Sequence, residues 1–249
     1  MPSTSMIKDD ADGIVLQATR NNAQWCDAVC RAHGLDSVLG DDVWASPRRT
    51  PPYYPDAVTL APTASEASVL ARIDTGNPGS SVKDSFSRLD LAPAGFEILF
   101  DAQWIHRPAN TSTGTPAAAA SATPLEWRRI TSAIGLADWE TAWGGAESTG
   151  LFRPALLTEE IAFLAALDAS GHIVAGAAAN RTGDVVGLSN VFATDGIPAD
   201  LAWRGSLALI ATLWPGQAVV GYESGADLHT AIRHGFRPVG PLRIWLQTS

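Results

Sequence analysis

The amino-acid sequence predicts a protein of the α/β class, with a mixed, mostly antiparallel sheet flanked by helices. Three apolar runs of strand length follow one another across short turns between 160 and 193, which indicates an antiparallel meander. Apolar residues then recur at helical spacing over 200–214, and further strand-like runs follow at 218–224 and 237–247. Strands that alternate with amphipathic helices in this way predict a sheet with helices packed against it.

The second half of the chain can be interpreted element by element. Its first expected strand leads into an amphipathic helix in which Trp139 and Trp143 lie four residues apart on one face. The turn at Ala169, Ser170 and Gly171 predicts a hairpin. After the amphipathic helix, the expected elements are a hairpin of strands 160–168 and 172–183, a third strand 185–193, a helix 200–214, a strand 218–224, a short helix 225–234 and a last strand 237–247.

Composition divides the chain into two parts. The stretch NTSTGTPAAAASATP, residues 110–124, is small, polar and low in complexity, so it is expected to be a linker. It separates an N-terminal half, 20–109, from a C-terminal half, 125–249. Residues 1–19 are expected to be a tail, because the first twelve are polar.

The charge of the chain excludes some classes of partner. A formal net charge of −9 over 249 residues argues against a nucleic-acid partner, since phosphate backbones select for basic surfaces. An acidic surface suits a cationic or amine substrate. No apolar run approaches 18 residues, so neither a membrane span nor a secretion signal is expected, and the protein is predicted to be cytoplasmic. Whether it forms a homodimer is left open.

The two cysteines, Cys26 and Cys30, lie four residues apart in a segment with helical periodicity, and His33 follows them. This spacing suits neither a zinc site nor a disulfide, because adjacent helical turns hold cysteine side chains poorly for both. We therefore expect buried, unpaired cysteines and no metal. Five of the nine tryptophans lie on predicted elements with apolar neighbours and are expected in the core: Trp25, Trp139, Trp143, Trp203 and Trp245. Tyr53 and Tyr54, between prolines, are predicted at the mouth of a pocket.

The order of elements from Val185 to Gln247, with the closing phrase VVGYESGADLHTAIRHGFRPVGPLRIWLQ, resembles the acyl-CoA-binding half of the GCN5-related N-acetyltransferases. The resemblance extends over 125–249. It implies that the strand 185–193 splays from the strand 218–224, and that the pantetheine arm of acetyl-CoA, or of another acyl-CoA, inserts in the gap. The corresponding edges are Asn190–Ala193 and Val220–Ser224.

The same resemblance implies a diphosphate loop at 193–198, where the family pattern is Q/R-x-x-G-x-G/A. Gly196 fits that pattern, whereas Ala193 replaces the basic or amide residue, Pro198 removes an N–H donor and Asp195 adds a negative charge. Arg204 and Arg181 are candidates to restore positive charge. The residues implied to contact the cofactor are Asn190, Val191, Phe192, Ala193, Gly196 and Ile197.

The family reaction is direct attack of a neutral amine on the thioester, which implies a general base near the cleft. Glu223 and Glu160 are the candidate carboxylates. Tyr222 is a candidate acid, but it projects to the face opposite Glu223 in a regular strand, so only one of the two can line the cleft. The tyrosine that many relatives carry on the last helix is replaced here by His229 and His234. The implied acceptor is an amine on a small molecule or on a protein.

The first half can be aligned with the second, although their similarity is weak. This internal similarity favours two tandem halves of related fold. Gly95 and Phe96 match Gly235 and Phe236, and Trp104 falls near Trp245. On the same alignment the segments 56–62 and 70–76 are expected to be strands. This half has too few residues for a full loop and long helix, so it is expected not to bind cofactor. A catalytically inactive module of the same fold that binds a ligand or a protein is the alternative function.

Overall fold

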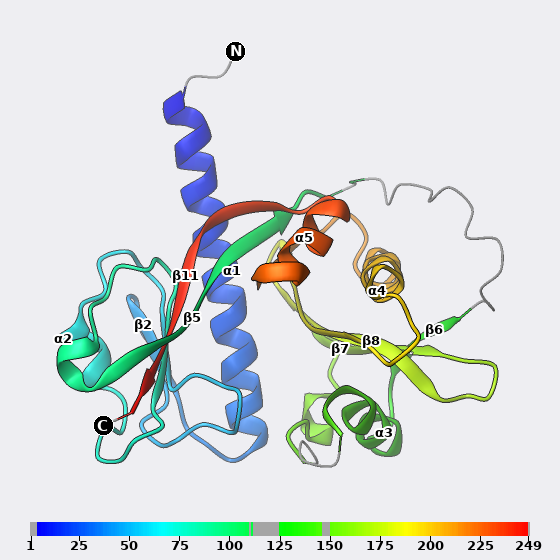
Figure 1. The fold of residues 1–249 in the computed structure, drawn as a ribbon, viewed down its shortest axis with the longest axis horizontal. Helices are drawn as coiled ribbons and strands as arrows, with labels where there is room; N and C mark the ends of the chain where they lie inside the picture. The colour runs from blue at the N-terminus through cyan, green and yellow to red at the C-terminus, as the bar shows by residue number, and fades with distance from the viewer. Residues whose placement is uncertain (1–3, 110, 112–124, 146–149, 249) are drawn as a thin grey trace. The chain divides into compact units, whose positions relative to one another are not determined.

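A computed structural model of the chain describes residues 4–109, 111, 125–145 and 150–248 (Figure 1). The described chain forms two compact units, and each unit draws on segments that are distant in sequence. The first unit contains Met1–Ile105, Tyr222–Gly225 and Pro238–Ser249, and the second contains His106–Gly221 and Ala226–Arg237. The predicted linker 110–124 lies outside the described residues, apart from Thr111.

The first unit is built on a sheet in which the last strand of the chain lies next to strands from its first hundred residues. The strand order is β1, β2, β3, β4, β11, β5. Strands β3 and β4 pair in parallel, whereas β1–β2, β2–β3 and β4–β11 pair antiparallel. The bounds are β1 Val38–Leu39, β2 Val43–Ala45, β3 Ala57–Thr59, β4 Ser81–Asp84, β5 Phe96–Arg107 and β11 Arg237–Gln247. The sequence places 125–249 in one half, but β11 completes the sheet of the first unit.

The first unit begins with the long helix α1, Thr4–Ala32, where the sequence predicts a tail over residues 1–19. The helix continues the periodicity of the cysteine segment toward the N-terminus, because Ile14, Val15 and Ala18 are buried at spacings of one to four residues. It ends where Gly34 adopts a positive φ of 70°, and the amide of Leu35 donates to the carbonyl of Cys30. The apolar face of the helix therefore starts within the predicted tail.

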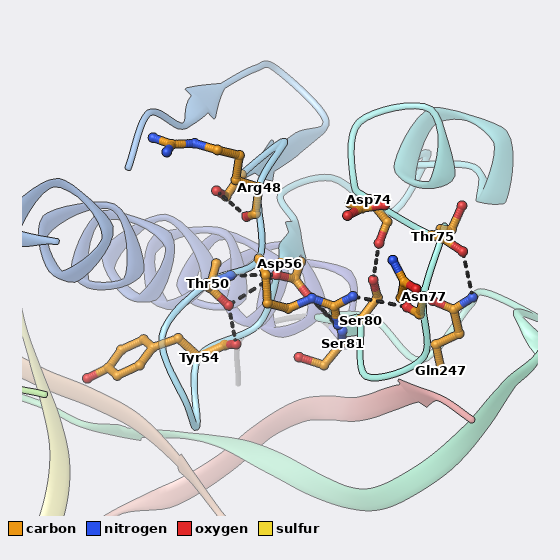
Figure 2. Close-up of polar contacts among 12 residues, drawn as sticks. Arg48, Thr50, Tyr54, Asp56, Asp74, Thr75, Asn77, Ser80, Ser81 and Gln247 are labelled. Carbon is orange, nitrogen blue, oxygen red and sulfur yellow. Dashed lines mark hydrogen bonds and ion pairs between the residues drawn. The ribbon is translucent and has the colours of Figure 1, made fainter. Parts of the chain in front are cut away.

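Asp56 organises the polar interior of the first unit (Figure 2). It is 2% exposed. Its Oδ1 accepts hydrogen bonds from the amide and hydroxyl of Thr50, at 2.9 and 3.1 Å, and its Oδ2 accepts one from the amide of Ser81 at 2.9 Å. Arg49 Nη1 lies 3.7 Å from the same Oδ2. One carboxylate thereby ties the loop 46–55 to the start of β4.

The expected strand at 70–76 is wrong. The structure has the short helix α2, Glu66–Leu70, followed by a turn, and Ser65 caps the helix through the amide of Ser68. Capping satisfies the free amides of the first turn, and Val69 is buried in the core. The expected strand at 56–62 is present as β3.

The apolar core of the first unit draws on both ends of the chain. Trp245 of β11 packs with residues from β2, β3 and β4 and from the segment before β5. The cluster comprises Val43, Ala45, Ala57, Val69, Ile73, Val82, Leu89, Leu91, Phe96 and Trp245.

The second unit contains the predicted meander. Its strand order is β10, β9, β8, β7, β6, in which β9–β10 is parallel and the other pairs are antiparallel. The bounds are β6 Glu126–Ile130, β7 Ile161–Leu167, β8 Ile173–Thr182, β9 Val185–Ala193 and β10 Ala218–Glu223. Together with the sheet of the first unit, these strands confirm the predicted mixed, mostly antiparallel architecture.

Helices cover both faces of this second sheet (Figure 1). Helix α3, Ala133–Gly144, lies on one face, and α4, Ala199–Leu213, lies on the other. Helix α5, Gly225–Arg233, precedes β11. Under α3 the Trp139 ring contacts Phe152, Phe163 and Phe192 at centroid distances of 5.4, 5.0 and 5.3 Å. No helix within the described residues combines the length and the apolar character needed to cross a membrane.

Gly95 and Gly235 end helical segments in the same way. Their φ angles are 82° and 88°. The amide of each following residue, Phe96 or Phe236, donates to the carbonyl five residues earlier, and a long strand follows. The two halves therefore share this motif at the aligned positions. Helix α1 ends on the same motif at Gly34, so the motif does not establish a repeat.

Cys26 and Cys30 are unpaired and buried, as predicted. Burial raises the pKa of Cys26 to about 11 and that of Cys30 to about 12, so both are thiols. Tyr54 is buried against Trp25, with ring centroids 6.2 Å apart, and does not lie at a pocket mouth. Tyr53 is 75% exposed.

Candidate functional site

A β-bulge interrupts β9 at Asn190. Gly176 of β8 lies opposite Phe192, and Ala178 lies opposite Ser189, so two steps along β8 match three along β9. Asn190 takes up the extra residue with a φ of 53°, a conformation that asparagine tolerates better than most residues. A bulge bends its strand and increases the local twist. The second half of β9 is thereby redirected relative to the first.

Strand β9 also runs well beyond its pairing with β10. The parallel register joins Val185, Val186 and Gly187 to residues 218–220, and β9 then continues for six residues to Ala193. Residues 189–193 are half-buried, whereas 185–188 are buried. The second half of the strand therefore offers backbone groups on the edge that faces away from β8.

Most side chains of this half-strand are already used in packing. Val191, Ala193 and Ile197 pack with Ala166, Ala175 and Ala202 on the α4 side. Phe192 packs edge-on against Trp139 on the α3 side, at an interplanar angle of 86°. Cofactor contacts at these predicted positions would therefore be made mainly by the backbone.

The loop after β9 is a tight turn that leads into α4. The amide of Ile197 donates to the carbonyl of Thr194 at 3.0 Å, and Gly196 has a φ of 86°, which is typical of the third position of a type II turn. If Gly196 carried a Cβ, no other heavy atom among the described residues would lie within 4 Å of it. Glycine is thus required by the backbone angle and not by crowding.

Pro198 is the N-cap of α4 and makes no side-chain cap hydrogen bond. The amides of the first helical residues, Ala199 and Asp200, have no acceptor within the helix. The amide of Leu201 donates to the carbonyl of Pro198 at 2.9 Å. Proline at this position therefore costs one donor outside the helix, and the first turn still presents amides at the positive end of the helix dipole.

Two side chains, one from the last residue of α5 and one from the residue that follows it, hold the carboxylate of Asp200. Arg233 Nη2 lies 3.3 Å from Oδ2, and His234 Nε2 lies 3.0 Å from Oδ1. Burial opposes ionisation of Asp200, but the hydrogen bonds from Arg233 and His234 outweigh it and lower its pKa. The sequence pointed to Arg204 and Arg181 for positive charge, whereas the structure brings Arg233 to the start of α4. No local sequence pattern predicts that the end of α5 lies close to the start of α4.

Arg181 and Glu160 form an ion pair elsewhere on the second sheet. Arg181 Nε and Nη2 lie 2.7 and 2.8 Å from the two carboxylate oxygens. The hydrogen bonds from Arg181 lower the pKa of Glu160. The pair lies beside the start of β9, because Arg181 pairs with Val186, whereas the bulge and the loop lie toward its end. Glu160 and the bulge are therefore not brought together.

Tyr222 and Glu223 end β10 and belong to the first unit. The Tyr222 ring meets Trp104 edge-on at 5.7 Å, and Lys83 Nζ lies 4.2 Å from its centroid. Glu223 is half-buried. Among the described residues, no three His, Cys, Asp or Glu side chains gather in an arrangement that would hold a metal ion.

Comparison with known proteins bears on the fold. No protein-family model matches the sequence, and no curated protein matches it. Solved structures do match. A GCN5-related N-acetyltransferase from Kribbella flavida is 15% identical, with a TM-score of 0.60 over 93% of this chain and 96% of that chain. A second, from Sphaerobacter thermophilus, is 14% identical, with a TM-score of 0.51 over 96% and 92%.

A tandem GNAT protein from the clavulanic acid biosynthesis pathway is also similar. It is 14% identical, with a TM-score of 0.53 over 96% of this chain and 94% of that chain. Each likeness extends over nearly the whole chain and so includes segments of both units. This chain therefore has the fold of the GCN5-related N-acetyltransferases.

Proposed function

We propose that this protein is an acyl-CoA-dependent N-acyltransferase, with acetyl-CoA as the expected donor and an amine as the acceptor. One observation carries the proposal. The bulge at Asn190 redirects a half-strand that extends beyond its parallel pairing, and this half-strand ends at a helix whose first amides have no capping side chain. An extended arm and a diphosphate are the two ligands that such an arrangement suits.

The donor would bind through backbone groups. The amides of Ala199 and Asp200, which have no acceptor within the helix, would face the diphosphate, while Arg233 offsets the negative charge of Asp200. The amide groups of the pantetheine arm would pair with the backbone of 189–193, as an added strand does. Binding through the backbone would allow the site to function although Ala193 and Pro198 depart from the usual pattern.

The reaction needs little covalent chemistry from the protein. The lone pair of a neutral amine attacks the thioester carbon, and the carbon–sulfur bond breaks when the tetrahedral intermediate collapses. The acyl group ends on nitrogen, the amine proton passes to a base, and the thiolate takes up a proton to leave as CoA. Backbone N–H groups at Val191 and Ala193 are the candidates to stabilise the oxyanion.

Glu223 is the proposed general base. A base must accept a proton near neutral pH, and the hydrogen bonds from Arg181 disfavour Glu160 for this role by lowering its pKa. Glu160 also lies beside the opposite end of β9 from the bulge. Tyr222 is already engaged by Trp104 and Lys83, which leaves it the secondary candidate, as an acid.

A binding module of the same fold is the second candidate function. The observation that favours it is the presence of Asp195 and Pro198 in the loop, because a carboxylate repels a diphosphate and a proline lacks a donor. Such a protein would bind CoA, another ligand or a protein without transferring an acyl group.

The test combines binding with turnover. Calorimetry with CoA and with acetyl-CoA measures binding, and release of free thiol from acetyl-CoA in the presence of amines measures transfer. The amines should include small polyamines, amino sugars and lysine-containing peptides. Thiol release that depends on one amine supports the transferase. Binding without transfer to any of these amines supports the module, and absence of binding at millimolar CoA contradicts the transferase.

A further inference from the structure

The second unit contains a cavity at the end of α4 remote from the proposed diphosphate site. Its volume is about 230 Å³. It lies beside the last two turns of α4, the turn 215–217 that follows them, the end of β5 and the start of β10. The side chains that matter for its chemistry are Arg107, Leu207, Ile210, Trp214, Gln217 and Val219. About eleven residues of helix, or roughly 16 Å, separate the start of α4 from Ile210.

Among the described residues that line the cavity, Arg107 is the only charged one, and it is 6% exposed. Its Nε donates to the carbonyl of His234 at 2.9 Å, and its Nη2 donates to the carbonyl of Thr111 at 2.6 Å. These bonds occupy two of the five N–H donors of a guanidinium. No carboxylate in the described part of the chain forms an ion pair with it. Residues 110–124 contain neither Asp nor Glu.

A buried cation without a counter-charge is costly, because the surrounding protein solvates it poorly. Burial accordingly lowers the pKa of Arg107. An anion in the cavity would remove this cost. Arginine suits a carboxylate in particular, since its planar N–H pairs match the two oxygens.

Gln217 supplies a second polar group. Its Oε1 is buried and has no hydrogen-bond partner. The oxygen and nitrogen of a side-chain amide are assigned from their partners, and a half-turn of this amide would present two N–H donors in place of the oxygen. Arg107 and Gln217 would then both donate to an anion.

Apart from Thr111, the other side chains of the wall are apolar. Leu207, Ile210, Trp214 and Val219 are all buried, and the cavity is smaller than the roughly 300–1,000 Å³ of pockets for drug-sized ligands. We propose that this cavity binds a small organic acid, with its carboxylate on Arg107 and Gln217 and its hydrocarbon part against the α4 wall. The proposal does not depend on the acyl-transfer function.

Hexanoate and hexanamide are suitable probes, because they share a chain and differ in charge. Ligand-observed NMR and calorimetry on the full chain should show hexanoate binding at least about tenfold more tightly than hexanamide, a difference of about 1.4 kcal/mol. Equal binding of the two, or no binding of hexanoate, would overturn the proposal. Preferential binding of inorganic phosphate would also overturn it, because an apolar wall adds nothing for that ion.

Two variants locate the binding. Arg107→Gln should weaken hexanoate by about tenfold or more while leaving hexanamide unchanged. Ala211→Phe places a ring at the mouth from an exposed helix position, so it tests the site even where Arg107→Gln fails to fold. Thr212→Phe is the matched control, since this exposed neighbour does not line the cavity. We expect Ala211→Phe to abolish hexanoate binding and Thr212→Phe to preserve it. Equal binding of hexanoate to Ala211→Phe and Thr212→Phe would contradict the assignment of the acid to this cavity.

Discussion

His234 Nε2 lies 3.0 Å from Asp200 Oδ1, so the residue that follows α5 is joined to the first turn of α4. The imidazole also stacks on Trp203 of the same helix, with an interplanar angle of 10°. Arg233 holds the second carboxylate oxygen at 3.3 Å. The start of α4, where we propose that the diphosphate binds, is thereby fixed by the turn between α5 and β11.

This pair makes the stability of the protein depend on pH. Burial lowers the pKa of His234 below its ordinary 6.5, and the hydrogen bond with Asp200 only partly opposes it. The unfolded chain therefore binds more protons than the native protein just below pH 6.5, and the free energy of unfolding falls as the pH falls through that window. Urea unfolding should show a smaller fall in His234→Gln than in the wild type. The measurement stays well above 3.8, the ordinary pKa of Asp. An equal or larger fall in the variant contradicts this assignment.

Gly205 and Gly13 are helical glycines with opposite surroundings. A Cβ on Gly205 would overlap the indole of Trp127, whereas nothing lies within 4 Å of a Cβ on Gly13. We expect Gly205→Ala to destabilise by about 1–3 kcal/mol, because the ring must move. Gly13→Ala should be neutral or stabilise by up to about 1 kcal/mol, because alanine favours the helix. Urea unfolding measures both, and similar values for the two variants would refute the packing of α4 on Trp127.

Asp56 should be among the least tolerant positions of the first unit. Asp56→Ala removes the acceptor of the buried Thr50 amide and of the partly buried Ser81 amide, and the loss of a buried acceptor costs about 1–3 kcal/mol. Asp56→Asn keeps one oxygen and should be less damaging. The free energy of unfolding in urea compares them. If Asp56→Ala were as stable as the wild type, the network in Figure 2 would not support the fold.

Glu223 and Glu160 give a matched pair for the catalytic proposal. Removing a general base lowers kcat by about 10²–10⁴. We expect this loss in Glu223→Gln with unchanged CoA affinity, and nearly full activity in Glu160→Gln, whose carboxylate is held by Arg181. The thiol-release assay measures both. The reverse pattern would assign the base to Glu160.

The second unit is the part of the fold that the sequence predicts best. The apolar run 185–193 matches β9 residue for residue, and the predicted helix 200–214 differs from α4 by one residue at each end. These elements have clear periodicity and end at turn residues such as Gly171 and Gly196, so local sequence is sufficient. Local sequence does not predict the bulge at Asn190, because a bulge is defined by how the residues of β9 pair with those of β8.

The first unit is predicted less well because long-range pairing decides it. Strands β2 and β3 have three residues each, and β4 lies between β3 and the C-terminal β11. An alignment to the second half predicted a strand at 70–76, where a capped helix and a turn occur instead. The contact of Arg233 with Asp200 was missed for the same reason, since the two residues are 33 positions apart.

The central claim is that the loop before α4 binds the diphosphate of CoA. The affinity for CoA of a variant with a strained backbone in this loop tests it most directly. Gly196 and Gly171 have similar φ angles, 86° and 82°, and nothing lies within 4 Å of a Cβ on either. Valine at either site imposes similar strain, on the order of 1–2 kcal/mol, but only Gly196 lies in the loop before α4. By calorimetry, Gly171→Val should bind CoA as the wild type does, and Gly196→Val should bind at least about tenfold more weakly. Equal affinity in the two variants would show that the diphosphate does not bind at this loop.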